Sequence, residues 1–334
     1  MKSRWLWLAI PWALFIALTI GWVIYWNVLA NGARERVEAW LAAEQARGAE
    51  ASIASIEARG FPVLLRLELR DVAYAPAGGG WRLSTAAGAL HVQMLNPQHV
   101  IFEAEAPLAL ARDDGHVTNI SAEKLIASVR WAGEALAQAG VEADNLLLDD
   151  PAEEGELRAE KLVANVRPDP RAAGDVQLSL ETRGLMLAQP VRSFEGLGQR
   201  VENLMLAAVI EQSAALAQSA EDDPLGPWSD AGGRLRIEGL VLKWGALDAA
   251  GVGHIGLDGE RRLMGELNLP IKEPAGFFQA LSASPEMDSG ARQMLMLLSA
   301  SFARSPEGLT LDLEGRDGVL RLEGIRARTL PPVY

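Results

Sequence analysis

Leu65-Arg66-Leu67-Glu68-Leu69-Arg70 is the stretch that decides the fold class. Every second side chain in it is apolar and the others are charged, which is the pattern of a strand with one buried face and one wet face. The alternation recurs at Leu309–Glu314 and Gly318–Glu323. Further strands are predicted at Trp81–Ser84, Leu90–Leu95, His99–Glu103, Leu125–Trp131, Asn145–Leu148, Leu157–Arg167, Val176–Leu187, Leu235–Trp244, Gly253–Leu257 and Leu263–Ile271. We therefore expect a mainly β (β-rich α+β) fold with a large antiparallel sheet, either open and curved or closed as a sandwich.

Signals for helices and turns are fewer. Short helices are predicted at Ala214–Ala220 and Ala275–Ser282, and a third from the stripe Ala291, Leu295, Leu298 and Phe302. Nearly every residue of Val201–Ile210 is apolar, so this run is either a buried strand or a core helix, and we favour a strand. Asp258-Gly259 predicts a hairpin turn between the strands on either side of it, with Gly259 supplying a positive φ.

The N-terminal apolar stretch Trp5–Ala30 is longer than the roughly 20 residues that a helix needs to cross a bilayer. Basic residues, Lys2 and Arg4, precede it, so the positive-inside rule predicts a cytoplasmic N-terminus. Tryptophan and tyrosine side chains near both ends suit the two membrane interfaces. The alternative is a signal peptide cleaved after Val28-Leu29-Ala30, but the apolar run is longer than an ordinary signal sequence.

These signals predict a single-pass protein of the bacterial inner membrane. The expected parts are a cytoplasmic tail (1–4), a transmembrane helix (5–30), a helical stalk (31–48) that Gly48 ends, and a periplasmic β-rich domain (49–334) with a sub-boundary near 188–230. The inner membrane, reached through residues 5–30, is therefore the expected first partner.

The composition of the chain excludes several classes of function. The chain has 334 residues, 49% of them hydrophobic, and 31 basic against 44 acidic side chains give a net charge of −13. This charge argues against binding of nucleic acid. The chain has no cysteine, which excludes disulfides, thiol catalysis and iron–sulfur clusters.

Two pairs of segments echo each other. Residues 122–130 read Ala-Glu-Lys-Leu-Ile-Ala-Ser-Val-Arg and residues 159–167 read Ala-Glu-Lys-Leu-Val-Ala-Asn-Val-Arg, and Gly233–Gly239 resembles Gly318–Gly324. Either a sheet unit has been duplicated, or strands with the same alternation look alike. We expect the apolar positions of the first pair to lie side by side on one surface, where they are candidates for a groove: Leu125, Ala127, Val129, Leu162, Ala164 and Val166.

Four short motifs resemble one family in their order and spacing. They are Arg59-Gly60-Phe61-Pro62, Asn96–Ile101, Trp228–Gly233 and Trp244-Gly245. Over nearly the whole chain, anchor included, they resemble the alphaproteobacterial membrane-anchored family catalogued as domain of unknown function 2125. The resemblance implies an envelope protein without an assigned activity and favours a strand at Val201–Ile210. A more distant similarity, in topology and in Gly-x-Leu-x-Leu strands, is to AsmA-like envelope proteins associated with lipid traffic. We interpret the motif positions as structural: Gly60, Phe61, Pro62, Asn96, Pro97, Trp228, Gly232, Gly233, Trp244 and Gly245.

Each motif that resembles a catalytic, cofactor-binding or metal-binding site lacks a feature that such a site requires. Gly251–Gly256 fits the dinucleotide pattern formally, but a hairpin follows where a helix is required. The four histidines, at positions 91, 99, 116 and 254, have no metal-ligand spacing. The acidic residues between 149 and 156 lack the spacing of a calcium loop and suit a solvated turn. We therefore expect no cofactor, no metal and no enzymatic activity.

The predicted helices are too few to cover the apolar face of so many strands. One expected function is the binding of lipid, or another apolar envelope component, in a β-lined groove that serves envelope maintenance. The alternative is a non-enzymatic scaffold with a dry core that holds other envelope proteins through strand edges.

Overall fold

The structure is a computed structural model that describes residues 3–93, 96–133, 135–152, 154–218, 223–285, 289–303, 308–322 and 325–334. Several predicted positions lie outside these residues: Met1 and Lys2 of the tail, Leu95, Glu153 of the acidic turn, residues 219–220 of a predicted helix, and Glu323 and Gly324 of the second echo.

The fold is mainly β, as the sequence predicts. In the described part of the chain, 18 strands belong to one antiparallel sheet. The chain divides into two compact units, the first comprising residues 1–121 and 125–134 and the second residues 122–124 and 135–334. The segment 188–230, where the sequence suggests a sub-boundary, lies inside the second unit.

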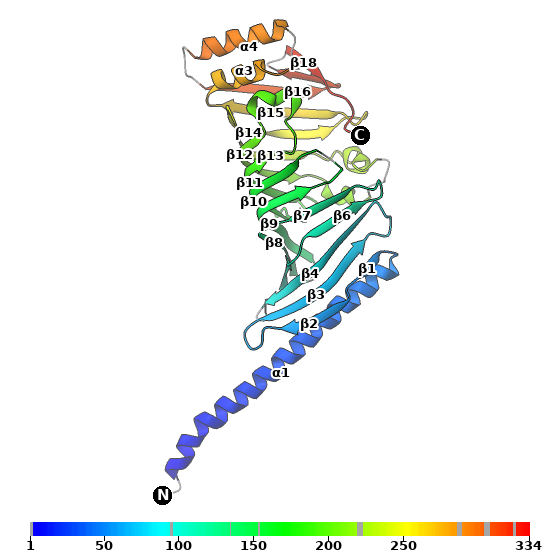
Figure 1. Cartoon of the computed structure of the whole chain (residues 1–334), viewed down its shortest axis with the longest axis vertical. Helices are drawn as coiled ribbons and strands as arrows, with labels where there is room; N and C mark the ends of the chain where they lie inside the picture. Colours follow the sequence, from blue (N-terminus) through cyan, green and yellow to red (C-terminus); the bar gives the residue numbers. More distant parts are fainter. Residues whose placement is uncertain are drawn as a thin grey trace. The chain divides into compact units, whose positions relative to one another are not determined.

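The first unit contains the long N-terminal helix and the early strands (Figure 1). Its elements are α1 (Ser3–Ala46), β1 (Glu50–Ser52), β2 (Ser55–Arg59), β3 (Leu65–Ala75), β4 (Trp81–Gln93), β5 (Asn96–Ala104), β6 (Leu108–Arg112), β7 (Val117–Ser121) and β8 (Lys124–Ala132). The strand β4 pairs along its first half with β6 and along its second half with β5, and β5 also pairs with β8.

Helix α1 continues without a break from the predicted span through the predicted stalk. Its portion from Ile10 to Ala46 contains a stretch long and apolar enough to cross a membrane, and that stretch is almost wholly exposed. The helix ends just before Gly48, which has a φ of +91° that glycine adopts without strain. Toward its C-terminal end α1 lies along β2 and β3 (Figure 1) and shares a core with β3.

One strand of the first unit replaces two predicted ones. Trp81–Ser84 and the described part of Leu90–Leu95 are the two ends of β4. The small residues between them interrupt the apolar alternation, so the sequence suggests a break there. Gly88 instead gives room to Phe102 of β5, whose ring lies 2.6 Å from where a Cβ of residue 88 would be. The strand therefore continues because its neighbour fills the space.

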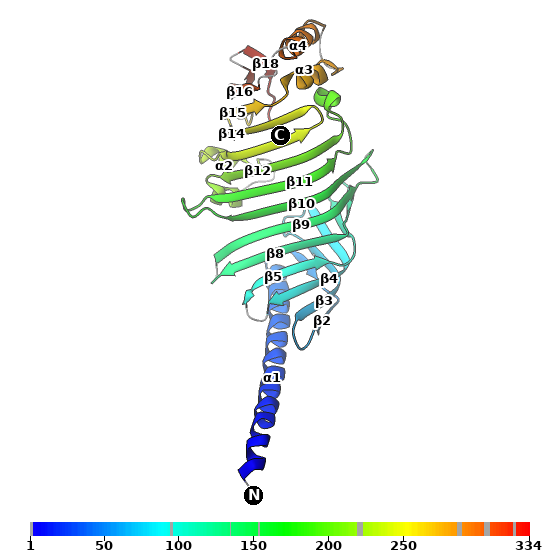
Figure 2. The same ribbon diagram turned by 90° about the vertical axis from the view of Figure 1, so that its left-hand side faces the viewer.

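In the second unit, consecutive strands pair in chain order from β9 to β18 (Figure 2). These strands are β9 (Ala135–Asp149), β10 (Glu156–Pro168), β11 (Val176–Met186), β12 (Arg200–Ile210), β13 (Leu235–Trp244), β14 (Leu247–Leu257), β15 (Leu263–Ile271), β16 (Leu309–Arg316), β17 (Val319–Leu322) and β18 (Ile325–Thr329). The strand β12 confirms the interpretation of Val201–Ile210 as a strand.

The helices of this unit are short: η1 (Arg192–Leu197), η2 (Ser213–Gln218), α2 (Gly226–Asp230), α3 (Pro274–Ser282) and α4 (Ser289–Phe302). The helices α3 and α4 agree with the prediction, and their apolar faces share a core with the sheet. That core contains Phe277, Phe278, Ala249, Ile271 and Leu311. The predicted helix at Ala214–Ala220 is a 3₁₀ turn in its described part, and the sequence does not predict η1, α2, β1, β2, β6, β7 or β18.

The hairpin predicted at Asp258-Gly259 is present, but Gly259 does not supply the positive φ. The strands β14 and β15 pair up to Leu257 and Leu263, so the loop between them has five residues. The Oδ1 atom of Asp258 accepts hydrogen bonds from the backbone N–H groups of Glu260 (2.9 Å) and Arg262 (3.0 Å). The positive φ, +59°, belongs to Arg261. The aspartate side chain therefore orders this turn.

Candidate functional site

An apolar cavity of about 510 Å³ lies in the first unit between α1 and the sheet. Four side chains of α1 line it, Ala33, Arg36, Val37 and Trp40, and their spacing places them on one side of the helix. The strands β3, β4, β5 and β8 supply the other wall. The full lining is Ala33, Arg36, Val37, Trp40, Ile53, Leu67, Leu69, Val72, Leu90, Val92, Val100, Phe102, Val129 and Trp131.

The strand register builds the floor of this cavity as two apolar rows that each cross four strands. One row is Leu65, Val92, Val100 and Val129, and the next is Leu67, Leu90, Phe102 and Ala127. The residues between them in sequence face the other side of the sheet, where the corresponding row is Arg66, His91, Ile101 and Ser128. The sheet is therefore apolar on the side of the cavity and largely polar on the opposite side.

Helix α1 covers only one end of these rows. Leu65 and Leu67, on β3, are each 1% exposed. Val100 and Val129, farther along the same row, are half-buried, and Trp131 at the end of β8 is 44% exposed. An apolar surface thus continues from a core under α1 to an open groove over β5 and β8. We call the described lining of this cavity the apolar groove.

A second cavity of about 710 Å³ adjoins the groove, because Val92 lines both. It is lined by Trp22, Pro62, Val63, Leu64, Leu65, His91, Val92 and Gln93. Trp22 belongs to the stretch of α1 that is apolar enough to span a membrane. The second cavity therefore lies nearer that stretch than the groove does, along the same helix.

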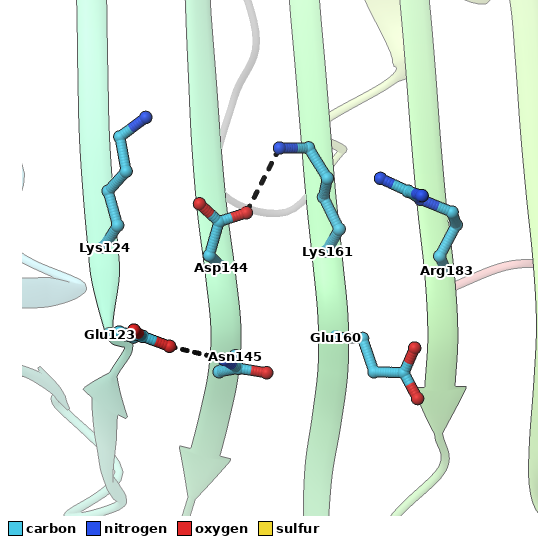
Figure 3. Close-up of a pocket in the computed structure, with 7 residues that line it drawn as sticks. All are labelled: Glu123, Lys124, Asp144, Asn145, Glu160, Lys161 and Arg183. Atoms are coloured by element: carbon cyan, nitrogen blue, oxygen red, sulfur yellow. Dashed lines mark hydrogen bonds and ion pairs between the residues drawn. The ribbon is translucent and has the colours of Figure 1, made fainter.

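A polar cavity of about 610 Å³ lies in the second unit, on the strands around β10 (Figure 3). Lys161 donates hydrogen bonds to Glu142 (3.0 Å) and Asp144 (3.1 Å), and Lys124 lies 3.4 Å from the same oxygen of Glu142. The hydrogen bonds from the two lysines lower the pKa of Glu142, and the hydrogen bonds to Glu142 and Asp144 raise the pKa of Lys161. The cavity is lined by Glu123, Lys124, Asp144, Asn145, Glu160, Lys161 and Arg183.

The first echo explains this cluster in part. Its two copies place Glu123-Lys124 and Glu160-Lys161 on either side of Asp144 and Asn145 of β9, as the sticks in Figure 3 show. Each lysine has a carboxylate partner, so the cluster offers no uncompensated charge to an anion. The described residues contain no group of three or more histidine, aspartate or glutamate side chains that could hold a metal ion. We interpret the cluster as an ion-pair network that joins neighbouring strands.

The strands that carry the six candidate groove residues do not pair with each other. The strand β8, with Leu125, Ala127 and Val129, pairs with β5 in the first unit. Both edges of β10, the strand with Leu162, Ala164 and Val166, are taken by β9 and β11. Of the six, Val129 lines the apolar groove and Ala127 lies in its floor rows.

The residues with formal motif spacing have structural roles. The segment Gly251–Gly256 lies inside β14, and a Cβ at position 253 would be 2.1 Å from the carbonyl oxygen of Glu266 on β15. His91 bonds Glu103 at 2.7 Å across β4 and β5. Asp150 of the acidic turn is buried and accepts a hydrogen bond from the backbone N–H of Ala152. These contacts explain the glycines, the histidine and the aspartate without a ligand.

The later family-motif positions hold turns of the second unit. Trp228 is buried in α2 and donates a hydrogen bond of 2.7 Å to the carbonyl oxygen of Glu211. Gly232 has a positive φ, and a Cβ at Gly233 would lie 2.3 Å from the Trp228 ring. Trp244 bonds the carbonyl oxygen of Gly198. Gly245 has a φ of +52°, and a Cβ there would lie 2.4 Å from the carbonyl oxygen of Leu197.

The earlier motif positions lie in the first unit. Gly60, Phe61 and Pro62 form the turn between β2 and β3, where Gly60 has a φ of +94°. Asn96 and Pro97 begin β5, and Asn96 pairs with Gln93 of β4. The turn at Phe61 and Pro62 lies beside the second cavity, because Pro62 lines it.

Comparison with known proteins identifies the family. The family described as "Uncharacterized protein conserved in bacteria (DUF2125)" matches residues 26–331. The chain belongs to this family. The match confirms the resemblance drawn from the motifs, but it begins at Trp26, so most of the anchor lies outside it. No curated protein and no solved structure matches the chain.

Sequence reasoning missed most of the groove. The alternation of β3 is plain in the sequence, and the stripe of Val37 and Trp40 predicts a helix. That stripe continues beyond the length of a membrane span, which is a sign that the helix covers another element. Which strands would lie beneath it depends on pairings between β3, β4, β5 and β8 that periodicity does not reveal.

Proposed function

We propose that this protein is a non-enzymatic, membrane-anchored lipid-binding protein of the bacterial envelope, with its folded part on the periplasmic side of the inner membrane. The apolar groove takes an acyl chain of a membrane lipid. The observation that carries the proposal is the pair of apolar rows across β3, β4, β5 and β8, which α1 covers at one end only. An uncovered apolar surface of this kind is costly in water, and a bound acyl chain would remove it from water.

A membrane lipid is the expected ligand because of the helix that forms one wall of the groove. The helix α1 carries both the apolar stretch that can span a bilayer and the side chains that line the groove. The groove is therefore built on the same helix that carries the membrane-spanning stretch. The volumes of the two cavities, about 510 and 710 Å³, lie within the range of small-molecule sites.

The rim of the groove also suits a lipid. Arg36 lines the groove and is exposed, and it has no ion-pair partner among the described residues. Its guanidinium can donate hydrogen bonds to a phosphate while the acyl chain lies on the apolar floor. Helical side chains tilt toward the N-terminus of their helix, which for Arg36 is the direction of the membrane-spanning stretch.

Photo-crosslinking of the full chain in lipid vesicles tests the proposal. The vesicles contain a phospholipid with a diazirine on one acyl chain, and adducts are mapped by mass spectrometry after irradiation. We expect adducts on β5 and β8 as well as on the apolar stretch of α1. Adducts confined to α1 would overturn the proposal and would favour the alternative, a scaffold with a dry core.

A further inference from the structure

We propose that the loop Gly60–Leu64 is a second membrane contact, which inserts Phe61, Val63 and Leu64 into the bilayer interface on the side of the folded domain. The loop joins β2 to β3, a position where exposed turns are ordinarily polar. Phe61 is 50% exposed, Val63 71% and Leu64 63%. Three adjoining apolar side chains are thus presented outward from the tip of a hairpin.

Two tryptophans of α1 fix the height of this loop along the helix. The indole N–H of Trp22 donates a hydrogen bond of 2.7 Å to the carbonyl oxygen of Pro62. The indole N–H of Trp26 donates one of 2.9 Å to the carbonyl oxygen of Leu64, and its ring packs edge-on against Phe61. The loop therefore lies at the level of these two tryptophans.

That level is the end of the apolar stretch of α1. Trp22, Tyr25 and Trp26 form an aromatic group there, and such residues gather where a transmembrane helix leaves the hydrocarbon. A loop hydrogen-bonded at this height places its apolar side chains beside the lipid headgroups and the first carbons of the acyl chains. The bilayer interface is thus the surface that covers Phe61, Val63 and Leu64.

Charge and backbone geometry agree with this position. No charged residue occurs from Gly60 to Leu65, in a chain whose net charge is −13. The uncharged loop can therefore approach a membrane surface where most of the chain is unsuited to do so. The backbone N–H of Leu64 bonds the carbonyl oxygen of Gly60 at 2.9 Å, and Gly60 has a φ of +94°. The loop is closed on itself, so its apolar side chains are held outward.

Insertion of the loop does not depend on the lipid-binding function, but it gives that function an entrance. Pro62, Val63 and Leu64 form one wall of the second cavity, which shares Val92 with the apolar groove. With the loop in the interface, the second cavity opens at the depth of the acyl chains. A lipid could then enter the groove sideways from the leaflet.

A depth measurement tests the inference on the full chain. Because the protein has no cysteine, Val63→Cys creates a single site for an environment-sensitive fluorophore. Val117→Cys is the control, since Val117 is 39% exposed on β7 of the same unit. Both proteins are reconstituted into vesicles of phosphatidylethanolamine and phosphatidylglycerol. Quenching is then measured with a doxyl-labelled lipid and with aqueous iodide.

We expect the label at position 63 to be quenched several-fold more by the doxyl lipid than the label at 117, and to be protected from iodide. A label at 63 that is as accessible to iodide as the one at 117 would overturn the inference. Leu64→Cys repeats the measurement at the neighbouring exposed position, so that one poorly folded variant does not decide it. Insertion of the loop without acyl adducts on β8 would remove the lipid-binding function alone.

Discussion

Val100 and Val129 lie directly opposite each other on β5 and β8, at the half-buried end of an apolar row that begins with the fully buried Leu65. The cover that α1 gives to the row decreases along it, although the chemistry of its side chains does not change. At the half-buried end of the row, a dry core and a lipid groove predict different effects of a substitution.

Replacing Val129 with glutamate separates the two readings. If this end of the row is an open groove, the new carboxylate can be hydrated, so circular dichroism should show a folded protein. The acyl-chain crosslinks to β5 and β8 should then fall several-fold. In a dry core, an unpaired charge would cost several kcal/mol and unfold a typical domain. Ser128→Glu, on the opposite face of the same strand, is the control and should keep the crosslinks.

The mature protein should keep its first 33 residues. Trp26, Ala30 and Ala33 of α1 are buried against Leu65 and Leu67 of β3. Cleavage after Ala30 would remove Trp26 and Ala30 from this core and expose the leucines to water. Mass mapping of the protein purified from membranes should therefore find peptides from the apolar stretch. A mature N-terminus near Asn31 would contradict the prediction.

Two glycines of one hairpin should respond differently to substitution. Gly265 has a φ of +143°, and a Cβ there would lie 2.0 Å from the carbonyl oxygen of His254. We expect Gly265→Ala to destabilise the protein by about 1–3 kcal/mol, which lowers Tm by roughly 2–4 °C per kcal/mol. At Gly259 a Cβ would meet no atom within 4 Å. Gly259→Ala should thus leave Tm nearly unchanged, and equal losses in thermal melts of the two variants would argue against this turn.

An ion pair in the second unit should make stability depend on acid pH. The carboxylate of Asp169 is inaccessible to solvent and bonds Arg171 through both oxygens, at distances from 2.9 to 3.2 Å. These hydrogen bonds lower the pKa of Asp169 from 3.8 to about 2. The stabilisation is therefore complete above the unfolded pKa of 3.8 and is lost as pH falls toward 2.

Urea unfolding followed between pH 5 and pH 2 checks this dependence. Asp169→Asn should lower stability at pH 5 and flatten the fall toward pH 2, because its side chain does not ionise. Asp317→Asn is the control, since the Asp317 side chain is 84% exposed. A profile for Asp169→Asn that runs parallel to that of the unsubstituted protein would contradict the assignment.

The local pattern of apolar side chains predicts much of this fold, because a strand with one solvent-exposed face has alternating apolar and polar residues. Leu65–Arg70 and Leu309–Glu314 are strands as expected, and Val201–Ile210 is a strand although its period is obscured. Periodicity does not predict the strands β2 and β6, because Ser55–Arg59 and Leu108–Arg112 are short and carry few large apolar side chains.

The groove could not be predicted in the same way, because it depends on pairing between distant residues. Val100 reaches Val129 only because β6 and β7 lie between β5 and β8 in the chain and not between them in the sheet. The echo of residues 122–130 and 159–167 predicts instead that β8 lies next to β10. This prediction is wrong, because strands with similar sequences need not pair, and β10 pairs with β9 and β11. The apolar positions of the echo include Val129, whereas Leu90 and Phe102 join the groove only through the register of β4 and β5.

The unbroken helix α1 also constrains how this chain can change in length. The side chains that meet the loop and the groove, from Trp22 and Trp26 to Ala33, Val37 and Trp40, follow one another at intervals that keep them on a single helix face. One residue inserted between Trp26 and Ala33 would turn every later position by about 100° and point the groove wall away from the sheet. Insertions and deletions in this stretch should therefore occur in whole helical turns, because only these keep the same helix face turned toward the sheet.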